Sequence, residues 1–202
     1  MKYNAECFFP SLVHIIETDV DKQLKPYCLK ANQTDPVGVV LSNNGGWHSR
    51  GNTKDSLITD NLYKVFNETI SNLYQHKLEI INHWININGH GSYNVVHDHP
   101  MSDLSGVFYI NVPENSGDIY FENPLSFQGH AELTSYTMEA TQTCNQYLKK
   151  YIKPIEGLLL VFPAHLRHGV LPNQSNEDRI SVSFNIRINH VRSSIFHGRM
   201  TA

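Results

Sequence analysis

Residues 81–88, Ile-Asn-His-Trp-Ile-Asn-Ile-Asn, mark the point at which the periodicity of this 202-residue chain changes. Alternate residues of a strand face opposite sides. One face here would carry isoleucines, namely Ile81, Ile85 and Ile87. The other would carry three amides and a tryptophan, namely Asn82, Trp84, Asn86 and Asn88. The pattern predicts a strand with its apolar face under a helix and its amide-rich face towards a polar cavity. On periodicity alone, solvent is the simpler environment for the amides.

The segment before this strand has the periodicity of a helix. Between residues 56 and 78, apolar residues recur at steps of three to five, namely Ile58, Leu62, Val65, Phe66, Ile70, Leu73 and Leu78. This amphipathic stripe predicts a helix over 56–78 that packs against the sheet. Further upstream, residues 8–18 predict a first strand and residues 21–31 a short helix.

The rest of the chain is dominated by short strands. They are predicted at 107–112, 118–121, 157–162 and 179–188, separated by Pro, Asn and Gly turns. Residues 141–151 fit either a helix or a strand. Several short strands after one helix favour a mainly β fold with supporting helices, a double-stranded β-helix (a cupin-like jelly roll). We expect a single domain over 1–202, with the supporting elements in 1–79, the β core in 80–190 and a tail in 191–202.

The composition argues against several classes of protein. Charged residues make up 17% of the chain and the net charge is −3, whereas a nucleic-acid-binding protein would carry a basic patch. The longest apolar run, 158–162, is far shorter than the roughly 20 residues that cross a bilayer, and the N-terminus lacks the features of a signal peptide. The three cysteines have no metal-type spacing, which favours a reducing compartment. We expect a cytoplasmic protein (in the host cytoplasm if the chain is viral), without nucleic-acid or membrane partners; a homodimer is compatible with these features.

His97 and His99 form the first candidate metal-binding pair. In an extended segment, residues i and i+2 face the same way, about 6.5–7 Å apart at their Cα atoms. Both imidazoles can therefore reach one metal ion, while Asp98 faces the opposite side. In a chain with 12 histidines among 202 residues, one such pair is expected by chance. The pair therefore indicates a metal site only if further ligand residues elsewhere in the chain accompany it.

A third histidine follows the predicted strand 157–162. Non-haem iron(II) sites use two histidines and usually one carboxylate, and leave positions open for substrate and oxygen. His168 is the first candidate for the distal ligand. His165 is the second, because the turn at Pro163 leaves the local register open.

The strand predicted at 179–188 alternates strictly. Its apolar residues are Ile180, Val182, Phe184 and Ile186, and the opposite face carries Arg179, Ser181, Ser183, Asn185 and Arg187. If that polar face lines a barrel, Arg179 and Ser181 would bind a small dicarboxylate, because a buried guanidinium requires an anionic partner and binds carboxylates in bidentate geometry. On an outer face, Arg179 would be a surface residue, the commoner situation for arginine.

Seven motifs occur in a consistent order along the chain. They are Gly46-Trp47-His48-Ser49, Trp84-x-Asn86, His97-x-His99-Pro100, Ser105-Gly106-Val107-Phe108-Tyr109, Asp118-x-x-Phe121-x-x-Pro124, Phe162-Pro163 through His168, and Arg179-Ile180-Ser181-Val182-Ser183-Phe184-Asn185. Over about residues 40–190, the chain resembles the 2-oxoglutarate/Fe(II)-dependent oxygenases. More narrowly, it is similar to a small branch common in marine bacteria and their phages, distantly related to prolyl 4-hydroxylases.

The resemblance implies a set of cofactors and ligands. Fe(II) would be bound by His97, His99 and His168, and 2-oxoglutarate by Arg179, with Ser181 and Tyr109 assisting. The implied activity uses O2 to hydroxylate an unactivated C–H bond, with release of succinate and CO2. Trp84, Asn86, Asn94 and Asn185 are further candidates for the cavity lining; a packed tryptophan and turn-capping asparagines are the alternatives.

One position departs from the pattern of the broad superfamily, which has His-x-Asp or His-x-Glu where this chain has His97-x-His99. Three neutral imidazoles would leave Fe(II) with its full charge, which favours an anionic keto acid. Three-histidine sets also occur in cupins that use no keto acid and in zinc sites. The alternatives are therefore a three-histidine dioxygenase or isomerase, and a non-catalytic jelly-roll binding module. The substrate, a small molecule or a peptide, would be selected by the loops in 32–55 and 124–150.

Overall fold

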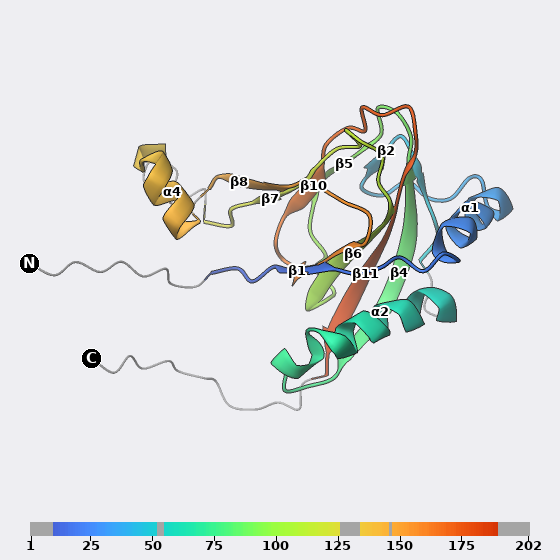
Figure 1. The fold of residues 1–202 in the computed structure, drawn as a ribbon, viewed down its shortest axis with the longest axis horizontal. Helices are drawn as coiled ribbons and strands as arrows, with labels where there is room; N and C mark the ends of the chain where they lie inside the picture. The colour runs from blue at the N-terminus through green and yellow to red at the C-terminus, as the bar shows by residue number, and fades with distance from the viewer. Residues whose placement is uncertain (1–9, 52–54, 126–133, 146, 190–202) are drawn as a thin grey trace, which may run out of the picture.

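Two antiparallel sheets form the centre of the computed structural model, which describes residues 10–51, 55–125, 134–145 and 147–189 (Figure 1). The strands are β1 His14–Glu17, β2 Asn43–Asn44, β3 Trp47–His48, β4 Leu78–Asn88, β5 Tyr93–His97, β6 Leu104–Asn111, β7 Ile119–Glu122, β8 Lys149–Ile152, β9 Leu158–Pro163, β10 His168–Val170 and β11 Arg179–Ile188. In this part of the chain the larger sheet has the order β1-β9-β6-β11-β4-β3 and the smaller one β2-β5-β10-β7-β8. The arrangement confirms the predicted double-stranded β-helix.

Helices cover the outer face of the larger sheet. They are α1 Leu24–Thr34, α2 Ser56–Glu68 and the 3-10 turn η1 Ser71–Leu73, while α4 Met138–Cys144 lies apart from the sheets beyond β7 and β8 (Figure 1). Leu24 of α1 and Phe66 of α2 belong to one buried cluster with Ile85 and Phe184 of the larger sheet. No helix in the described ranges has both the length and the apolar character that crossing a membrane requires.

The predicted helix over 56–78 is too long by ten residues. Asp55 caps the start of α2 by accepting a hydrogen bond from the Ile58 N–H, but the helix ends at Glu68. Leu73 is 68% exposed, and Leu78 already pairs with Ile188 of β11. The apparent helical period of these two leucines therefore has different causes: one lies in a surface turn and the other begins a strand.

The two faces of β4 follow the prediction at Trp84, Ile85, Asn86 and Ile87, but Ile81 is not in the core, and Asn82 and Asn88 are not among the cavity-lining residues. Ile85 and Ile87 are buried in the cluster under the helices, and Trp84 and Asn86 face the space between the sheets. The pairing with β11 shifts at Asn185/Ile186, so that Ile80 pairs with Ile186 and joins the core. The placement of Ile81 in the apolar core was wrong, because this bulge changes the alternation at the start of the strand.

The four strands predicted downstream correspond to β6, β7, β9 and β11. The segment 141–151, which fitted two structures, contains the end of α4 and the start of β8. The strand predicted at 8–18 is limited to His14–Glu17 within the described residues. Strands β5 and β10 were not predicted from periodicity, since five and three residues are too few to establish a period.

The N-terminal segment contributes strands to both sheets. β1 pairs with β9, β3 with β4, and β2 with β5. The single-domain organisation over 1–202 stays a prediction, and the tail at 191–202 lies outside the described residues.

A second buried cluster fills part of the space between the sheets. It includes Tyr109 of β6, Phe121 of β7 and Phe162 of β9. Glycine is required at position 106 of β6, since a Cβ atom there would clash with the Phe184 ring and with the carbonyl oxygen of Leu160. This cluster closes one part of the interior, and the polar residues gather in the remainder.

Candidate active site

A narrow cavity between the two sheets contains most of the polar residues singled out from the sequence. Its polar and aromatic lining includes Ser42, Trp84, Asn86, Asn94, His97, His99, Tyr109, His168, Arg179, Ser181 and Ser183. The volume is about 40 Å³, which is room for about three waters. Both sheets contribute, because the polar faces of β4 and β11 lie opposite β5 and β10.

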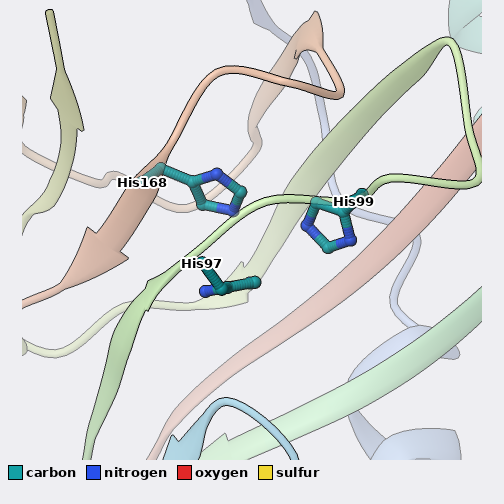
Figure 2. Close-up of side chains that lie close together, drawn as sticks. All are labelled: His97, His99 and His168. Carbon is teal, nitrogen blue, oxygen red and sulfur yellow. The ribbon is translucent and has the colours of Figure 1, made fainter. Parts of the chain in front are cut away.

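Three histidines converge at this cavity from two paired strands and a turn (Figure 2). His97 ends β5 and pairs with His168, the first residue of β10. His99 lies two residues past β5, where its backbone N–H donates to the Ala164 carbonyl at 2.9 Å. The prediction of an extended pair is therefore met only in part: His97 is on the strand and His99 is beyond its end.

One ring nitrogen of each histidine lies within 4.8 Å of those of the other two. A metal ion about 2 Å from each nitrogen requires separations of no more than about 4 Å, so small ring rotations suffice. Within the described residues this group contains no carboxylate, and the intervening Asp98 is exposed. The donor set fits a divalent transition metal that accepts imidazole ligands.

Backbone carbonyls orient two of the three rings. Nδ1 of His97 lies 2.8 Å from the Val95 oxygen, and Nδ1 of His168 lies 2.9 Å from the Leu166 oxygen. A carbonyl oxygen only accepts, so each Nδ1 carries the proton and donates. Each Nε2 is left with a free lone pair, the arrangement that metal-ligating histidines require.

An aromatic stack supports the third ring. The Trp84 ring lies 5.7 Å from that of His99, and the His48 ring stacks on Trp84 with ring centroids 5.5 Å apart. His48 is 3% exposed and is not among the cavity-lining residues. It therefore packs against Trp84 without lining the cavity.

The three imidazoles are neutral at physiological pH. Burial and, to a smaller extent, the nearby His97 lower the pKa of His168 to about 3 and that of His99 to about 4. Burial also lowers the pKa of His97. The group consequently offers three neutral lone-pair donors, since protonated histidines this close would repel one another.

Arg179 is a buried cation that forms no ion pair with any of the described residues. It is 2% exposed, and its Nη1 donates to the carbonyls of Ser116 at 2.5 Å and Gly117 at 3.1 Å. Its Nε has no hydrogen-bond partner, and no carboxylate within the described ranges forms an ion pair with it. Because an uncompensated charge is costly inside a protein, this guanidinium fits an incoming carboxylate.

Two hydroxyl groups lie in the same part of the cavity. Ser181 and Tyr109 are 5% and 1% exposed and pair across β11 and β6. Burial raises the pKa of Tyr109 to about 12, so this phenol stays protonated and can donate. Asn86 adds an amide whose Oδ1 has no partner, while its Nδ2 donates to Ser183 Oγ at 3.0 Å.

The structure places two predicted site residues outside this cavity. His165 is exposed and does not belong to the histidine group. Asn185 is not among the lining residues, since its Oδ1 accepts a hydrogen bond from the Ser105 hydroxyl at 2.7 Å. Trp84, Asn86, Asn94, Tyr109 and Ser181 do line it.

Two lining serines were not predicted. Ser183 shares the polar face of β11 with Arg179 and Ser181, so the strict alternation of that strand could have identified it. Ser42 is near the site because β2 pairs with β5, and the Asn94 amide donates to its Oγ at 3.3 Å. A two-residue strand is too short to show a periodicity, and no motif in the sequence includes Ser42.

Comparisons with known proteins support this geometry. A family model described as "Putative 2OG-Fe(II) oxygenase" matches residues 82–185, just over half of the chain. This range includes the three histidines and Arg179. No curated protein sequence shows a significant match.

Solved structures with a similar fold include three prolyl hydroxylases. One is a prolyl-4-hydroxylase from Pseudomonas putida, with a TM-score of 0.58, 13% identity, and coverage of 88% of this chain and 93% of that chain. A viral collagen prolyl hydroxylase from Paramecium Bursaria Chlorella virus-1, solved with 2-oxoglutarate, has a TM-score of 0.56, 15% identity, and coverage of 87% and 96%. A prolyl hydroxylase from Trichoplax adhaerens, bound to a hypoxia inducible factor peptide, has a TM-score of 0.60, 13% identity, and coverage of 87% and 83%. At sequence identities of 13–15%, the similarity to these structures shows that the fold is shared and nothing more.

Proposed function

Because this chain belongs to the 2OG-Fe(II) oxygenase family, we propose that it hydroxylates an unactivated C–H bond. In this reaction one oxygen atom of O2 enters the product and the other enters succinate, while 2-oxoglutarate loses CO2. The observation that carries the proposal is the presence, in the same cavity, of three convergent neutral imidazoles and one buried guanidinium that has no carboxylate partner among the described residues.

His97, His99 and His168 would hold the iron. Bound Fe(II) supplies the oxygen-activating chemistry that no side chain of the protein can provide. The protein's contribution is to fix the ligand lone pairs: the Val95 and Leu166 carbonyls keep the Nδ1 protons of His97 and His168 away from the metal side. Because the ligand group includes no carboxylate in the described residues, the metal would keep its full positive charge, which favours an anionic keto acid.

Arg179 would bind the distal carboxylate of 2-oxoglutarate. Its unpartnered Nε provides a donor for that carboxylate, while the Ser116 and Gly117 carbonyls hold the guanidinium in place. Ser181 and Tyr109 lie in the same cavity and would donate hydroxyl hydrogen bonds to cosubstrate oxygens. A planar guanidinium with hydroxyl donors suits a carboxylate better than a point charge would.

Apolar residues of both sheets would exclude water from the reaction. Val107, Ile119, Phe162 and Val170 form walls of the cavity between the sheets. Water exclusion strengthens the polar interactions inside a site and prevents side reactions.

A reaction without a keto acid is the second candidate. Its support is the all-histidine ligand group, which also suits three-histidine dioxygenases and isomerases. Arg179 would then bind the substrate itself. The two candidates differ in one measurable property, namely whether turnover depends on 2-oxoglutarate.

We expect succinate formation by the Fe(II)-loaded protein to require 2-oxoglutarate and O2 together. The measurement is NMR detection of succinate during screening against metabolite and peptide libraries, with each of the two components omitted in turn. A true substrate should raise succinate formation and gain one oxygen atom, detectable by mass spectrometry. Product formation that continues unchanged without 2-oxoglutarate would replace this proposal with the second candidate.

A further inference from the structure

A second cavity lies on the opposite side of the larger sheet from the histidines. It has a volume of about 400 Å³ and lies between α1, the start of α2 and the outer face of β3 and β4. Its walls include Ala31 of α1, Ile58 of α2, Trp47 of β3 and Ile85 of β4. It shares no described lining residue with the cavity between the sheets. Small-molecule sites commonly have volumes of about 300–1,000 Å³.

His83 is an unexplained polar residue in this cavity. It lies on β4 beside Trp84 but faces the helices, and it is 1% exposed. Its Nε2 is fully buried without a hydrogen-bond partner among the described residues. Buried polar groups are almost always partnered. A bound molecule that supplies the missing hydrogen bond would account for a histidine at this position.

The charged residues of the lining balance one another. Asp35 accepts from Arg50 Nε at 3.1 Å, and the remaining charges are Lys30 and Asp55. Asp55 accepts a hydrogen bond from the Ile58 N–H at 3.5 Å, and burial together with this nearby carboxylate raises the pKa of Tyr27 to about 12. Two cations and two carboxylates leave no net charge, which favours a neutral occupant.

The polar group of the occupant follows from the chemistry of imidazole. A neutral imidazole has one donor nitrogen and one acceptor nitrogen. A hydroxyl group can both donate and accept, so it can pair with Nε2 of His83 in either tautomer. The buried neighbours Trp47, Ile58 and Ile85 would surround an apolar body.

We propose that this second cavity binds a neutral small molecule with an apolar body and a hydroxyl group that hydrogen-bonds to Nε2 of His83. The site is independent of the iron, so its test does not require an active enzyme. The occupant's body would lie between the helices and β4, and its hydroxyl would point to the sheet.

Benzyl alcohol and its near-isostere ethylbenzene test this site directly. In NMR titrations of the 15N-labelled full-length chain, we expect benzyl alcohol to cause saturable shifts centred on the amides of Ala31, Ile58 and Ile85. Ethylbenzene, which lacks the hydroxyl, should bind about two- to tenfold more weakly, the loss expected for one hydrogen bond. Absence of saturable shifts at these amides, or equal affinity for the two compounds, would overturn the proposal.

Three variants assign the effect to this cavity. His83→Leu should remove the preference for the alcohol, and Ala31→Leu, which fills part of the space, should weaken both compounds. His90→Leu changes an exposed histidine and should leave both affinities unchanged. A preference that persists in a folded His83→Leu protein would contradict the assignment, and if that variant does not fold, the wild-type and Ala31→Leu titrations decide.

Discussion

Replacing His168 by alanine is expected to lower the affinity for Fe(II) by at least about 100-fold, because even the loss of an outer-shell partner of a metal ligand typically costs 10–100-fold. His168 is 5% exposed, and its ring is oriented by the Leu166 carbonyl. Two remaining imidazoles cannot replace it, since within the described residues the group contains no carboxylate and the intervening Asp98 is exposed. Succinate formation should be lost at Fe(II) concentrations that saturate the wild-type protein.

His165→Ala is the matched control for this variant. His165 lies three residues earlier on the same turn but is exposed and outside the histidine group. Metal affinity is measured by competition with a chelator, and folding by circular dichroism. Equal losses in the two variants would show that the turn, rather than the ligand, had been disturbed. Wild-type affinity in a folded His168→Ala protein would exclude His168 as a ligand.

Replacing Arg179 by leucine is expected to raise the Kd for 2-oxoglutarate by at least about 30-fold. Truncating one partner of a buried charge pair costs about 2–5 kcal/mol, which corresponds to a factor of about 30 or more. Arg179 is the buried cation of the cavity and has an unpartnered Nε. The affinity for Fe(II) should change little, because Arg179 is not part of the histidine group.

Arg187→Leu provides a control on the same strand, where the arginine is exposed. Arg179→Lys, which keeps the charge without the planar fork, should give a Kd between those of the wild type and Arg179→Leu. The measurement is calorimetric titration of 2-oxoglutarate into the metal-loaded proteins under argon. An unchanged Kd in Arg179→Leu would contradict the proposed role, and a comparable loss in Arg187→Leu would indicate a non-specific effect.

Long elements with a clear period were predictable from the sequence. The strands β4 and β11 have 11 and 10 residues, so their alternation was evident, and the polar face of β11 led to Arg179. The end of α2 was not predictable, because Leu73 and Leu78 continue its period although one lies in a turn and the other in a strand. Periodicity records spacing and does not show where a backbone changes conformation.

The site was predictable where a motif coincides with a strand end. His97 and His168 are such residues, and they meet because β5 and β10 pair. Ser42 and Asn185 could not be placed from the sequence. Ser42 lies near the site because the two-residue strand β2 pairs with β5. Asn185 accepts a hydrogen bond from Ser105 and does not line the cavity. Likewise, nothing in the sequence distinguished His83, whose setting depends on the space between two helices and the sheet.

Anaerobic titration of the Fe(II)-loaded protein with 2-oxoglutarate tests the central claim most directly. Chelation of Fe(II) by the keto acid through its C1 carboxylate and 2-oxo group produces a visible charge-transfer absorption band. If His97, His99 and His168 hold the metal and Arg179 holds the distal carboxylate, the band should develop and saturate at one equivalent. A protein that binds Fe(II) one to one, yet develops no band at saturating 2-oxoglutarate, would contradict the claim.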